Sequence, residues 1–332
     1  MHCSGAPWCA RIEQARPLQI IMKATRESYG EALVQLGKKY PEIVALDAET
    51  KNSTFSEFFK KKFPHRFYDC FIAEQNMIGM AVGMARMGKI PFASTFAAFL
   101  SRAYDQIRMA GLGESNIKLV GSHAGVSIGE DGSSQMALED LAMMRAVWNS
   151  VVLYPSDDVS TSKLVEEMVK HHGLCYLRTT RAKTPSLYES GENFPIGGFK
   201  VHSSSANRKS QTAEEQVTII SAGITLHEAL KAQKELENKI DVMVIDLYSI
   251  KPINAEELRK AVVGDRIIAV EDHWFEGGLG DAVLNVFADH PNVRIEKLAV
   301  TSLPHSGSPE ENLRRAGIDK EGIKKKINVL IR

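Results

Sequence analysis

A single carboxylate, Glu74, lies at the junction of two apolar stretches of different character. Residues 66–73 have the composition of a strand, and residues 75–87 are rich in Met, Ala and Gly and predict a buried helix. A carboxylate in apolar surroundings loses its hydration, so it is either paired or used in proton chemistry. Taken alone, Glu74 is more often explained by structural pairing than by catalysis.

Two further segments carry residue types that are suited to binding. Residues 94–99 read Ser-Thr-Phe-Ala-Ala-Phe, and Phe96 and Phe99 have the spacing that shares one face of a helical turn. Residues 121–132 are rich in glycine and contain His123 and Asp131. Aromatic pairs at this spacing are usually core residues, and a histidine at a strand end is often satisfied by its neighbours. The residue types alone therefore leave both a pocket and a packed core open.

The elements that must position these residues alternate between strand and helix patterns, which predicts parallel α/β sheets flanked by helices. Strands are expected at 43–46, 117–120, 151–154, 175–177, 217–221, 242–246, 266–271 and 293–298. Helices are expected at 97–109, at 225–236 and at 25–39, the last with Thr25 as its N-cap. A polar, Ser-rich stretch without periodicity separates two domains. We expect an extension at 1–22, a domain at 23–190, a linker at 191–214 and a domain at 215–332.

The composition of the 332 residues is that of a globular chain, with 44% hydrophobic and 25% charged residues. Its 41 basic and 41 acidic residues balance, which argues against a nucleic-acid or anionic-membrane surface. Four cysteines fit neither a disulfide framework nor a paired zinc site, so we expect free thiols in the cytoplasm and no metal site in this chain. No apolar run reaches the roughly 18 residues of a membrane span.

The three segments around Glu74, Phe96 and His123, in this order and at this spacing, resemble the cofactor-binding half of the transketolase family. The likeness continues in unbroken order from Ala24 to the C-terminus, through the segments 47–56, 101–108, 134–141, 154–157 and 270–278. It implies a thiamine-diphosphate pyrimidine-binding domain followed by a transketolase C-terminal domain. Each is expected to be a parallel or mixed sheet flanked by helices.

Full-length transketolases carry a further N-terminal half that binds the cofactor diphosphate through a metal ion, marked by a Gly-Asp-Gly segment and a later Asn. No segment of this chain matches that motif. The resemblance therefore implies the C-terminal subunit of a split transketolase, with Mg²⁺ or Ca²⁺ on an N-terminal partner subunit. A homodimer or heterotetramer is expected, because active sites of the family form at a subunit interface. Residues 1–22 lie outside the resemblance, and Met22 is an alternative start.

The resemblance implies roles in cofactor binding. Glu74 is expected to be the catalytic carboxylate against the aminopyrimidine ring of thiamine diphosphate, which then removes a proton from the thiazolium carbon. Phe96 and Phe99 are expected to line the pyrimidine pocket, with Phe96 stacked on the ring. Gln135 is expected near the cofactor or the substrate. Glu49 stands where many members carry Asp, and its contact to the cofactor or the partner half stays open.

The resemblance also implies a grip on sugar phosphates, which need cations and donors converging on one end of a pocket. The expected set is Arg26, Ser53, His123 and Arg181, with Asp131 bonded to a hydroxyl beside the reacting carbon. Taken singly, each of these residues could equally be a surface or turn residue without a role in binding.

The implied activity is transfer of a two-carbon glycolaldehyde unit from a ketose phosphate to an aldose phosphate, in the pentose phosphate pathway. Deoxyxylulose-phosphate synthases and the beta subunits of 2-oxoacid dehydrogenases remain alternatives with the same fold. His123 and Asp131 favour the transferase, because sugar recognition needs such polar contacts. A non-catalytic module that binds the partner half is disfavoured by Glu74 and the phosphate set. His273 is expected to serve structure and packing rather than chemistry.

Overall fold

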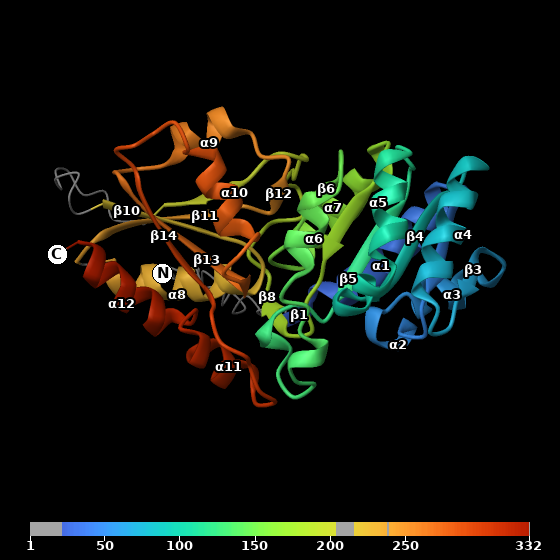
Figure 1. Ribbon diagram of the computed structural model, residues 1–332, viewed down its shortest axis with the longest axis horizontal. Helices are drawn as coiled ribbons and strands as arrows, with labels where there is room; N and C mark the ends of the chain where they lie inside the picture. The colour runs from blue at the N-terminus through green and yellow to red at the C-terminus, as the bar shows by residue number, and fades with distance from the viewer. Residues whose placement is uncertain (1–21, 204–215, 238, 332) are drawn as a thin grey trace, which may run out of the picture.

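The computed structural model describes residues 22–203, 216–237 and 239–331. These residues form two α/β lobes side by side, with the N-terminal part of the chain in one lobe and the C-terminal part in the other (Figure 1). Residues 1–21 of the expected extension and residues 204–215 of the expected linker lie outside the described residues.

The first lobe contains a seven-stranded sheet in the order β12-β6-β7-β5-β4-β2-β3. Its neighbouring strands are parallel except for the antiparallel pair β12 and β6. Most of these strands are apolar and buried along their whole length, as expected of a sheet covered on both faces. The strands are β2 (Ile43–Asp47), β3 (Phe67–Asp69), β4 (Ile90–Phe96), β5 (Lys118–Ser122), β6 (Val151–Leu153), β7 (Cys175–Arg178) and β12 (Ser249–Lys251).

Helices cover both faces of this sheet. One face packs on α1 (Thr25–Lys39), α3 (Glu57–Lys62) and α7 (Asp158–Lys170). The other packs on α4 (Glu74–Arg86), α5 (Tyr104–Leu112) and α6 (Asp140–Ala146). Short helical segments fill the connections, namely α2 (Lys51–Thr54), η1 (Pro64–Arg66), η2 (Ala97–Ala103), η3 (Val126–Ile128) and η4 (Ser133–Gln135).

The second lobe contains a five-stranded sheet in the order β14-β13-β10-β11-β9. Only β9, at one edge, is antiparallel to its neighbour. The strands are β9 (Lys200–His202), β10 (Gln216–Ser221), β11 (Asp241–Asp246), β13 (Arg266–Trp274) and β14 (Arg294–Val300). The helices are α8 (Ile224–Leu236), α9 (Ala255–Ala261), α10 (Leu279–Val286), α11 (Pro309–Ala316) and α12 (Lys320–Leu330). A two-stranded ribbon of β1 (Met22–Ala24) and β8 (Lys183–Pro185) lies beside the two sheets.

The fold class expected from the sequence is confirmed, and several local expectations are wrong. The helix expected at 97–109 is the 3₁₀ segment η2 followed by α5, and Phe96 still belongs to β4. Thr25 is the first residue of α1 rather than its cap, since Ala24 holds the cap position. Strand β9 lies within the stretch expected to be a linker, and β12 crosses from the second lobe into the first sheet.

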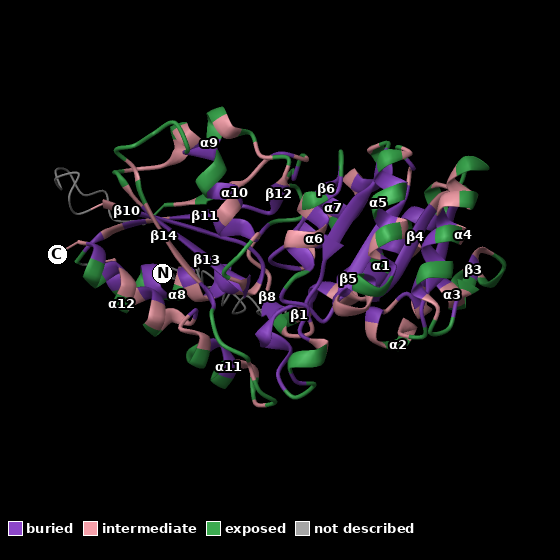
Figure 2. Ribbon diagram, viewed as in Figure 1, coloured by how far each residue is buried: buried purple, intermediate pink, exposed green. Residues whose placement is uncertain are grey.

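The two lobes share a continuous apolar core, which includes Tyr176 and Leu141 of the first lobe and Ile220 and Ala269 of the second. Figure 2 shows this buried material in the strands of both sheets and between the lobes. No helix within the described ranges is long and apolar enough to cross a membrane.

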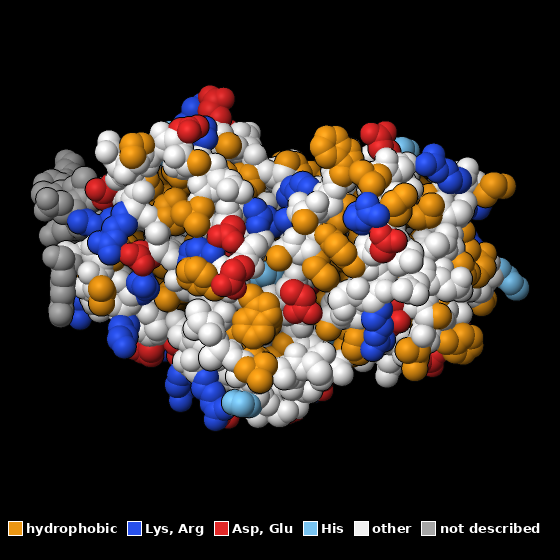
Figure 3. All heavy atoms as spheres, in the orientation of Figure 1, with side chains coloured by type: hydrophobic (Ala, Val, Ile, Leu, Met, Phe, Trp, Pro, Cys, Tyr) orange, Lys and Arg blue, Asp and Glu red, His pale blue; other side chains and the backbone are white. Residues whose placement is uncertain are grey.

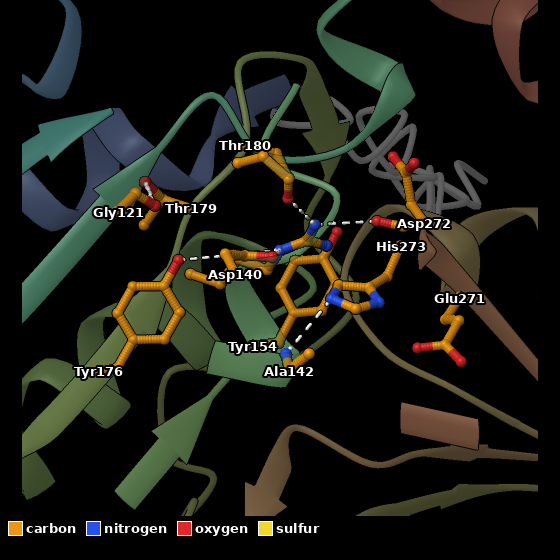
Figure 4. Close-up of polar contacts among 12 residues, drawn as sticks. Gly121, Asp140, Ala142, Tyr154, Tyr176, Thr179, Thr180, Glu271, Asp272 and His273 are labelled. Atoms are coloured by element: carbon orange, nitrogen blue, oxygen red, sulfur yellow. Dashed lines mark hydrogen bonds and ion pairs between the residues drawn. The ribbon is translucent and has the colours of Figure 1, made fainter. Parts of the chain in front are cut away.

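A buried ion pair lies at the contact between the lobes. Arg178 Nε donates to Asp140 at 2.8 and 3.1 Å, and Tyr176 donates its hydroxyl to the same carboxylate at 2.5 Å. Arg178 Nη2 reaches the carbonyl of Asp272 in the second lobe at 2.9 Å. His273 accepts the backbone N–H of Ala142 at 3.3 Å (Figure 4). His273 thus packs between the lobes, and burial lowers its pKa to about 4.

Candidate functional site

One cleft of about 570 Å³ collects eight of the residues that the sequence singled out. It lies where the parallel strands of the first sheet end, because Phe96 is the last residue of β4 and His123 directly follows β5. The carboxyl ends of strands are the usual ligand-binding edge of an open α/β sheet. A larger groove of about 700 Å³, lined in part by Lys23 and Asp158, contains none of the eight. The cleft residues are Arg26, Ser53, Phe96, Phe99, His123, Asp131, Gln135 and Arg181.

A hydrogen-bonded pair of threonines brings Arg26 and Arg181 together although they lie far apart in the sequence. Thr180 donates its backbone N–H to Thr25 Oγ1 at 2.8 Å, and the two hydroxyls lie 3.2 Å apart. Both threonines are buried, so this contact fixes the start of α1 against the segment that follows β7. The neighbouring arginines therefore enter the cleft from two different elements.

Buried Asp47, at the end of β2, shapes the loop that carries Ser53 and Glu49. One carboxylate oxygen accepts the backbone N–H of Thr50 at 2.6 Å, and the other accepts the hydroxyls of Thr54 and Ser56 at 2.7 and 2.8 Å. Burial raises the pKa of Asp47 to about 6, although these donors favour its charged form. The loop then presents the Ser53 carbonyl to Arg26 Nη1, which donates to it at 2.8 Å.

The loop between β5 and η4 is held by a residue of the second lobe. Asp272 accepts the backbone N–H groups of Val126 at 2.6 Å and Ser127 at 3.2 Å. Gly125 has φ 89, and a Cβ there would clash with the Asp272 carboxylate, so this close approach requires glycine. Asp272 thereby positions the segment that carries His123 and Asp131.

Cationic groups converge on one end of the cleft. Arg181 Nη1 donates to the Glu130 carboxylate at 3.0 Å and lies 3.5 Å from that of Asp131. Burial, together with Arg26 and Arg181, lowers the pKa of His123 to about 3, so its imidazole is neutral near pH 7. Burial and the proximity of Arg181 also lower the pKa of Arg26. Two arginines and a neutral histidine suit an anion such as a phosphate ester.

The aromatic residues form a column of flat groups. The rings of Phe96 and His123 stack with centroids 4.0 Å apart, and those of Phe96 and Phe99 with centroids 5.2 Å apart. The guanidinium carbon of Arg102 lies 4.4 Å from the centroid of Phe99. The ring expected to stack on the cofactor, Phe96, is thus in contact with His123 and Phe99 in this structure.

Glu74 lies at the Arg102 end of this column and does not line the cleft. It is the first residue of α4, is 3% exposed and accepts a hydrogen bond from Arg102 Nη1 at 2.5 Å. Sequence reasoning missed Arg102, and its signal was present, since it stands in the segment 101–108. Glu49 is also outside the cleft, is exposed, has φ 64 and lies 3.9 Å from Lys51 Nζ.

Two polar atoms in the cleft lack partners. Within the described residues, buried Arg26 Nε and Gln135 Oε1 have no hydrogen-bond partner. Unpaired polar atoms are costly when they are excluded from water, so a ligand that pairs with either atom would remove that cost. In the described ranges, no group of three His, Cys, Asp or Glu is arranged to hold a metal ion.

Comparisons with protein families match both lobes. The family described as "Transketolase, pyrimidine binding domain" matches residues 22–186, and "Transketolase, C-terminal domain" matches residues 205–323. Transketolase of Rattus norvegicus is 51% identical over 313 residues, which cover 93% of this chain and 49% of that protein. Human transketolase is 50% identical over the same length. The chain spans about half the length of these relatives.

Solved structures agree. A structure titled "Split gene transketolase, inactive beta4 tetramer" has a TM-score of 0.83 and 35% identity, covering 93% of this chain and 98% of that one. Transketolase from Leishmania mexicana matches with a TM-score of 0.78 at 21% identity, and the match covers 96% of this chain and 47% of that one. At this identity the likeness supports the fold alone.

Proposed function

The chain belongs to the transketolase family, and on that premise we propose that it is the C-terminal subunit of a thiamine-diphosphate-dependent transketolase. Its reaction would transfer a two-carbon glycolaldehyde unit from a ketose phosphate to an aldose phosphate. The observation that carries the proposal is the cleft itself. Eight side chains from separate segments, of the types that a flat ring and a sugar phosphate need, line one hollow.

The residues present fit the pyrimidine part of thiamine diphosphate, the cofactor of this family. Phe96 and Phe99 offer a flat apolar wall. Gln135 Oε1 is a buried acceptor with no partner among the residues that the structure describes, and it is suited to the ring's amino group. Glu74 supplies a carboxylate next to this wall. We propose that the diphosphate and its Mg²⁺ or Ca²⁺ lie on the partner half, and that Glu49 contacts the cofactor or that half.

When bound, thiamine diphosphate supplies a nucleophilic carbon that attacks the ketose carbonyl. In the proposed mechanism Glu74 holds a proton against the aminopyrimidine ring, and its burial excludes water from that contact. Arg26, Arg181 and Ser53 fix the phosphate of the sugar at the far end of the cleft. Neutral His123 donates a hydrogen bond to the substrate, and Asp131 accepts one from a hydroxyl beside the reacting carbon.

The proposed partner is an N-terminal subunit that carries the diphosphate and metal site. Support comes from the similar solved chain, which is described as a split-gene transketolase in an inactive beta4 tetramer. By analogy we propose that this chain is inactive alone and associates with itself and with the missing half.

The polar cleft favours a transketolase over the related thiamine enzymes. A pyruvate site of a deoxyxylulose-phosphate synthase or a 2-oxoacid dehydrogenase needs fewer polar contacts than Arg26, His123, Asp131 and Arg181 provide. Basic and acidic side chains are interspersed over the face in Figure 3, and the formal net charge is +0, which gives no support for nucleic acid or a membrane as partner. We propose a cytoplasmic location, because the two cysteines within the described residues, Cys70 and Cys175, are buried free thiols.

The test is ketol transfer from xylulose 5-phosphate to ribose 5-phosphate with thiamine diphosphate and Mg²⁺. The chain is assayed alone and together with a candidate N-terminal half. The Glu74→Ala variant of this chain is then assayed with the same N-terminal half. Activity only in the mixture with intact Glu74 is expected. A stable complex without activity would contradict the proposed reaction, and activity of the chain alone would contradict the proposed division of the site.

A further inference from the structure

Arg102 makes two contacts that a cofactor ring would also need. Its Nη1 donates to Glu74 at 2.5 Å, and its guanidinium carbon lies 4.4 Å from the centroid of Phe99. The side chain of Glu74 is 3% exposed, whereas that of Arg102 is 50% exposed. A buried carboxylate is therefore neutralised by an arginine that comes in from the surface.

A guanidinium and an aminopyrimidine share the features that matter for these contacts. Both are planar and both stack on an aromatic face. A guanidinium donates N–H groups to a carboxylate, and a ring nitrogen of the aminopyrimidine shares the proton that Glu74 would hold. Phe99 and Glu74 offer one stacking surface and one carboxyl group at the same place. The two ligands therefore compete for the same pair of residues.

We infer that Arg102 is a positioning residue that occupies the pyrimidine place in the unloaded subunit and must leave Glu74 when the cofactor ring arrives. This inference rests on the proposed function for the identity of the ring. The ion pair keeps Glu74 ordered and charge-compensated before assembly, because a buried carboxylate without a partner is costly. It also weakens cofactor binding, since only the fraction of subunits with a displaced Arg102 can accept the ring.

The first arm of the test needs neither cofactor nor partner. Chemical unfolding of the chain alone is measured for wild type, Arg102→Ala, Glu74→Gln and the double variant. Arg102→Ala is expected to destabilise the chain, and to do so much less once Glu74 is Gln. Arg108→Ala is the matched control, since Arg108 is also 50% exposed and is bonded to a carboxylate, that of Asp105. Independent, additive effects at positions 102 and 74 would overturn the inference.

The second arm is calorimetric titration of thiamine diphosphate, with Mg²⁺, into the chain paired with its N-terminal half. Arg102→Ala is expected to tighten binding about tenfold, because the competing cation is gone. Arg102→Lys keeps the charge without the planar fork and is expected to fall between wild type and Ala. Arg102→Gln serves in place of Ala if the latter does not fold. Arg108→Ala is expected to bind as wild type does.

A purely structural role for Arg102 predicts a different result. The proposed displacement of Arg102 would be overturned if the Ala, Gln and Lys variants bind the cofactor more weakly than wild type or equally well. Wild type and Arg108→Ala must bind normally in the same experiment. Absence of binding by every pair, wild type included, would contradict the proposed function and with it the displacement. The unfolding cycle would still decide whether Glu74 and Arg102 hold one another.

Discussion

At the scale of single side chains, the cleft contains hydrogen-bonding atoms that the free chain does not use. Gln135 lines the cleft, and its buried Oε1 has no partner among the described residues. Gln233, in contrast, donates to the carbonyls of His202 and Val242 at 2.8 and 2.7 Å. Gln135 is therefore the glutamine with an atom free to bind a ligand, whereas Gln233 stabilises the fold through its two hydrogen bonds.

Gln135→Leu is expected to weaken thiamine diphosphate binding by the assembled enzyme about tenfold, the worth of roughly one buried hydrogen bond. The free energy of unfolding of the chain should not fall and should rise slightly, because the buried oxygen that is lost has no partner among the described residues. Calorimetric titration and chemical unfolding measure the two quantities. Gln233→Leu is the opposite control and should cost about 1–3 kcal/mol of stability. A stability loss in Gln135→Leu equal to that of Gln233→Leu would refute this assignment.

Arg181→Ala is expected to raise the KM for the ketose phosphate by about 10- to 100-fold, with a smaller effect on kcat, because phosphate contacts are made in both ground and transition states. Steady-state ketol transfer by the assembled enzyme measures both constants. Arg315, which is exposed and paired with Glu311 on α11, provides the control Arg315→Ala. A fall in kcat at unchanged KM would place Arg181 outside the phosphate grip.

At the scale of elements, the site depends on loops that buried carboxylates hold. Asp47 anchors the segment with Ser53, and Asp272 anchors the segment with His123. Burial raises the pKa of Asp47 to about 6, above its value of about 3.9 in unfolded chains. Between these values the folded chain retains a proton that the unfolded chain has released. The contribution of Asp47 to stability is therefore full below about pH 4 and is lost as the pH rises through 6.

Asp47→Asn removes this titration. Between pH 4 and pH 6 the free energy of unfolding of the wild type should therefore fall by on the order of 1–3 kcal/mol relative to that of the variant. Above pH 6.5 the difference should be constant. Chemical unfolding of the chain alone over this range measures it, with Asp105→Asn on the surface of α5 as the control. A pH-independent difference between wild type and Asp47→Asn would contradict a protonated Asp47 in the folded chain.

Local elements follow from the sequence where a pattern runs through a whole element. The strands β2, β5, β7 and β10 lie within one or two residues of the expected bounds, because short apolar runs define them. Strand β12 has three residues, and its place in the first sheet depends on contacts with β6 that no local pattern encodes. The helix expected at 97–109 begins as the 3₁₀ segment η2, and the pairing of β4 with β5 keeps the preceding Phe96 extended.

At the scale of the whole molecule, the lobes are joined by apolar packing and by the hydrogen bond from Arg178 Nη2 to the Asp272 carbonyl. The buried carboxylate of Asp140, in the same lobe as Arg178, pairs with this arginine. Removing one partner of such a pair leaves the other charge uncompensated. Asp140→Asn is therefore expected to lower the free energy of unfolding by about 3–5 kcal/mol. Chemical denaturation measures it, with Asp281→Asn, a partly exposed carboxylate bonded to Lys297, as the control. An effect no larger than that of the control would contradict a stabilising role for this buried pair.

The cleft composition was predictable because long motifs of the family fix it, and eight expected residues do meet in one hollow. Their mutual positions were not, since the contact of Thr25 with Thr180 and that of Asp272 with Val126 join segments more than a hundred residues apart. Arg102 was missed although its segment 101–108 was singled out, because its contact with Glu74, 28 residues away, is made only in the folded chain. Its role depends on where the α4 terminus, which carries Glu74, meets η2.

The central claim is that this chain holds only half of a cofactor site. The most direct measurement is a thiamine diphosphate titration, with Mg²⁺, of the chain alone, of the N-terminal half alone and of their mixture. Saturable binding in the mixture, at one cofactor per pair of chains, and none by this chain alone is the expected result. Equally tight binding by this chain alone would contradict the claim, because it would mean that one chain supplies the entire site.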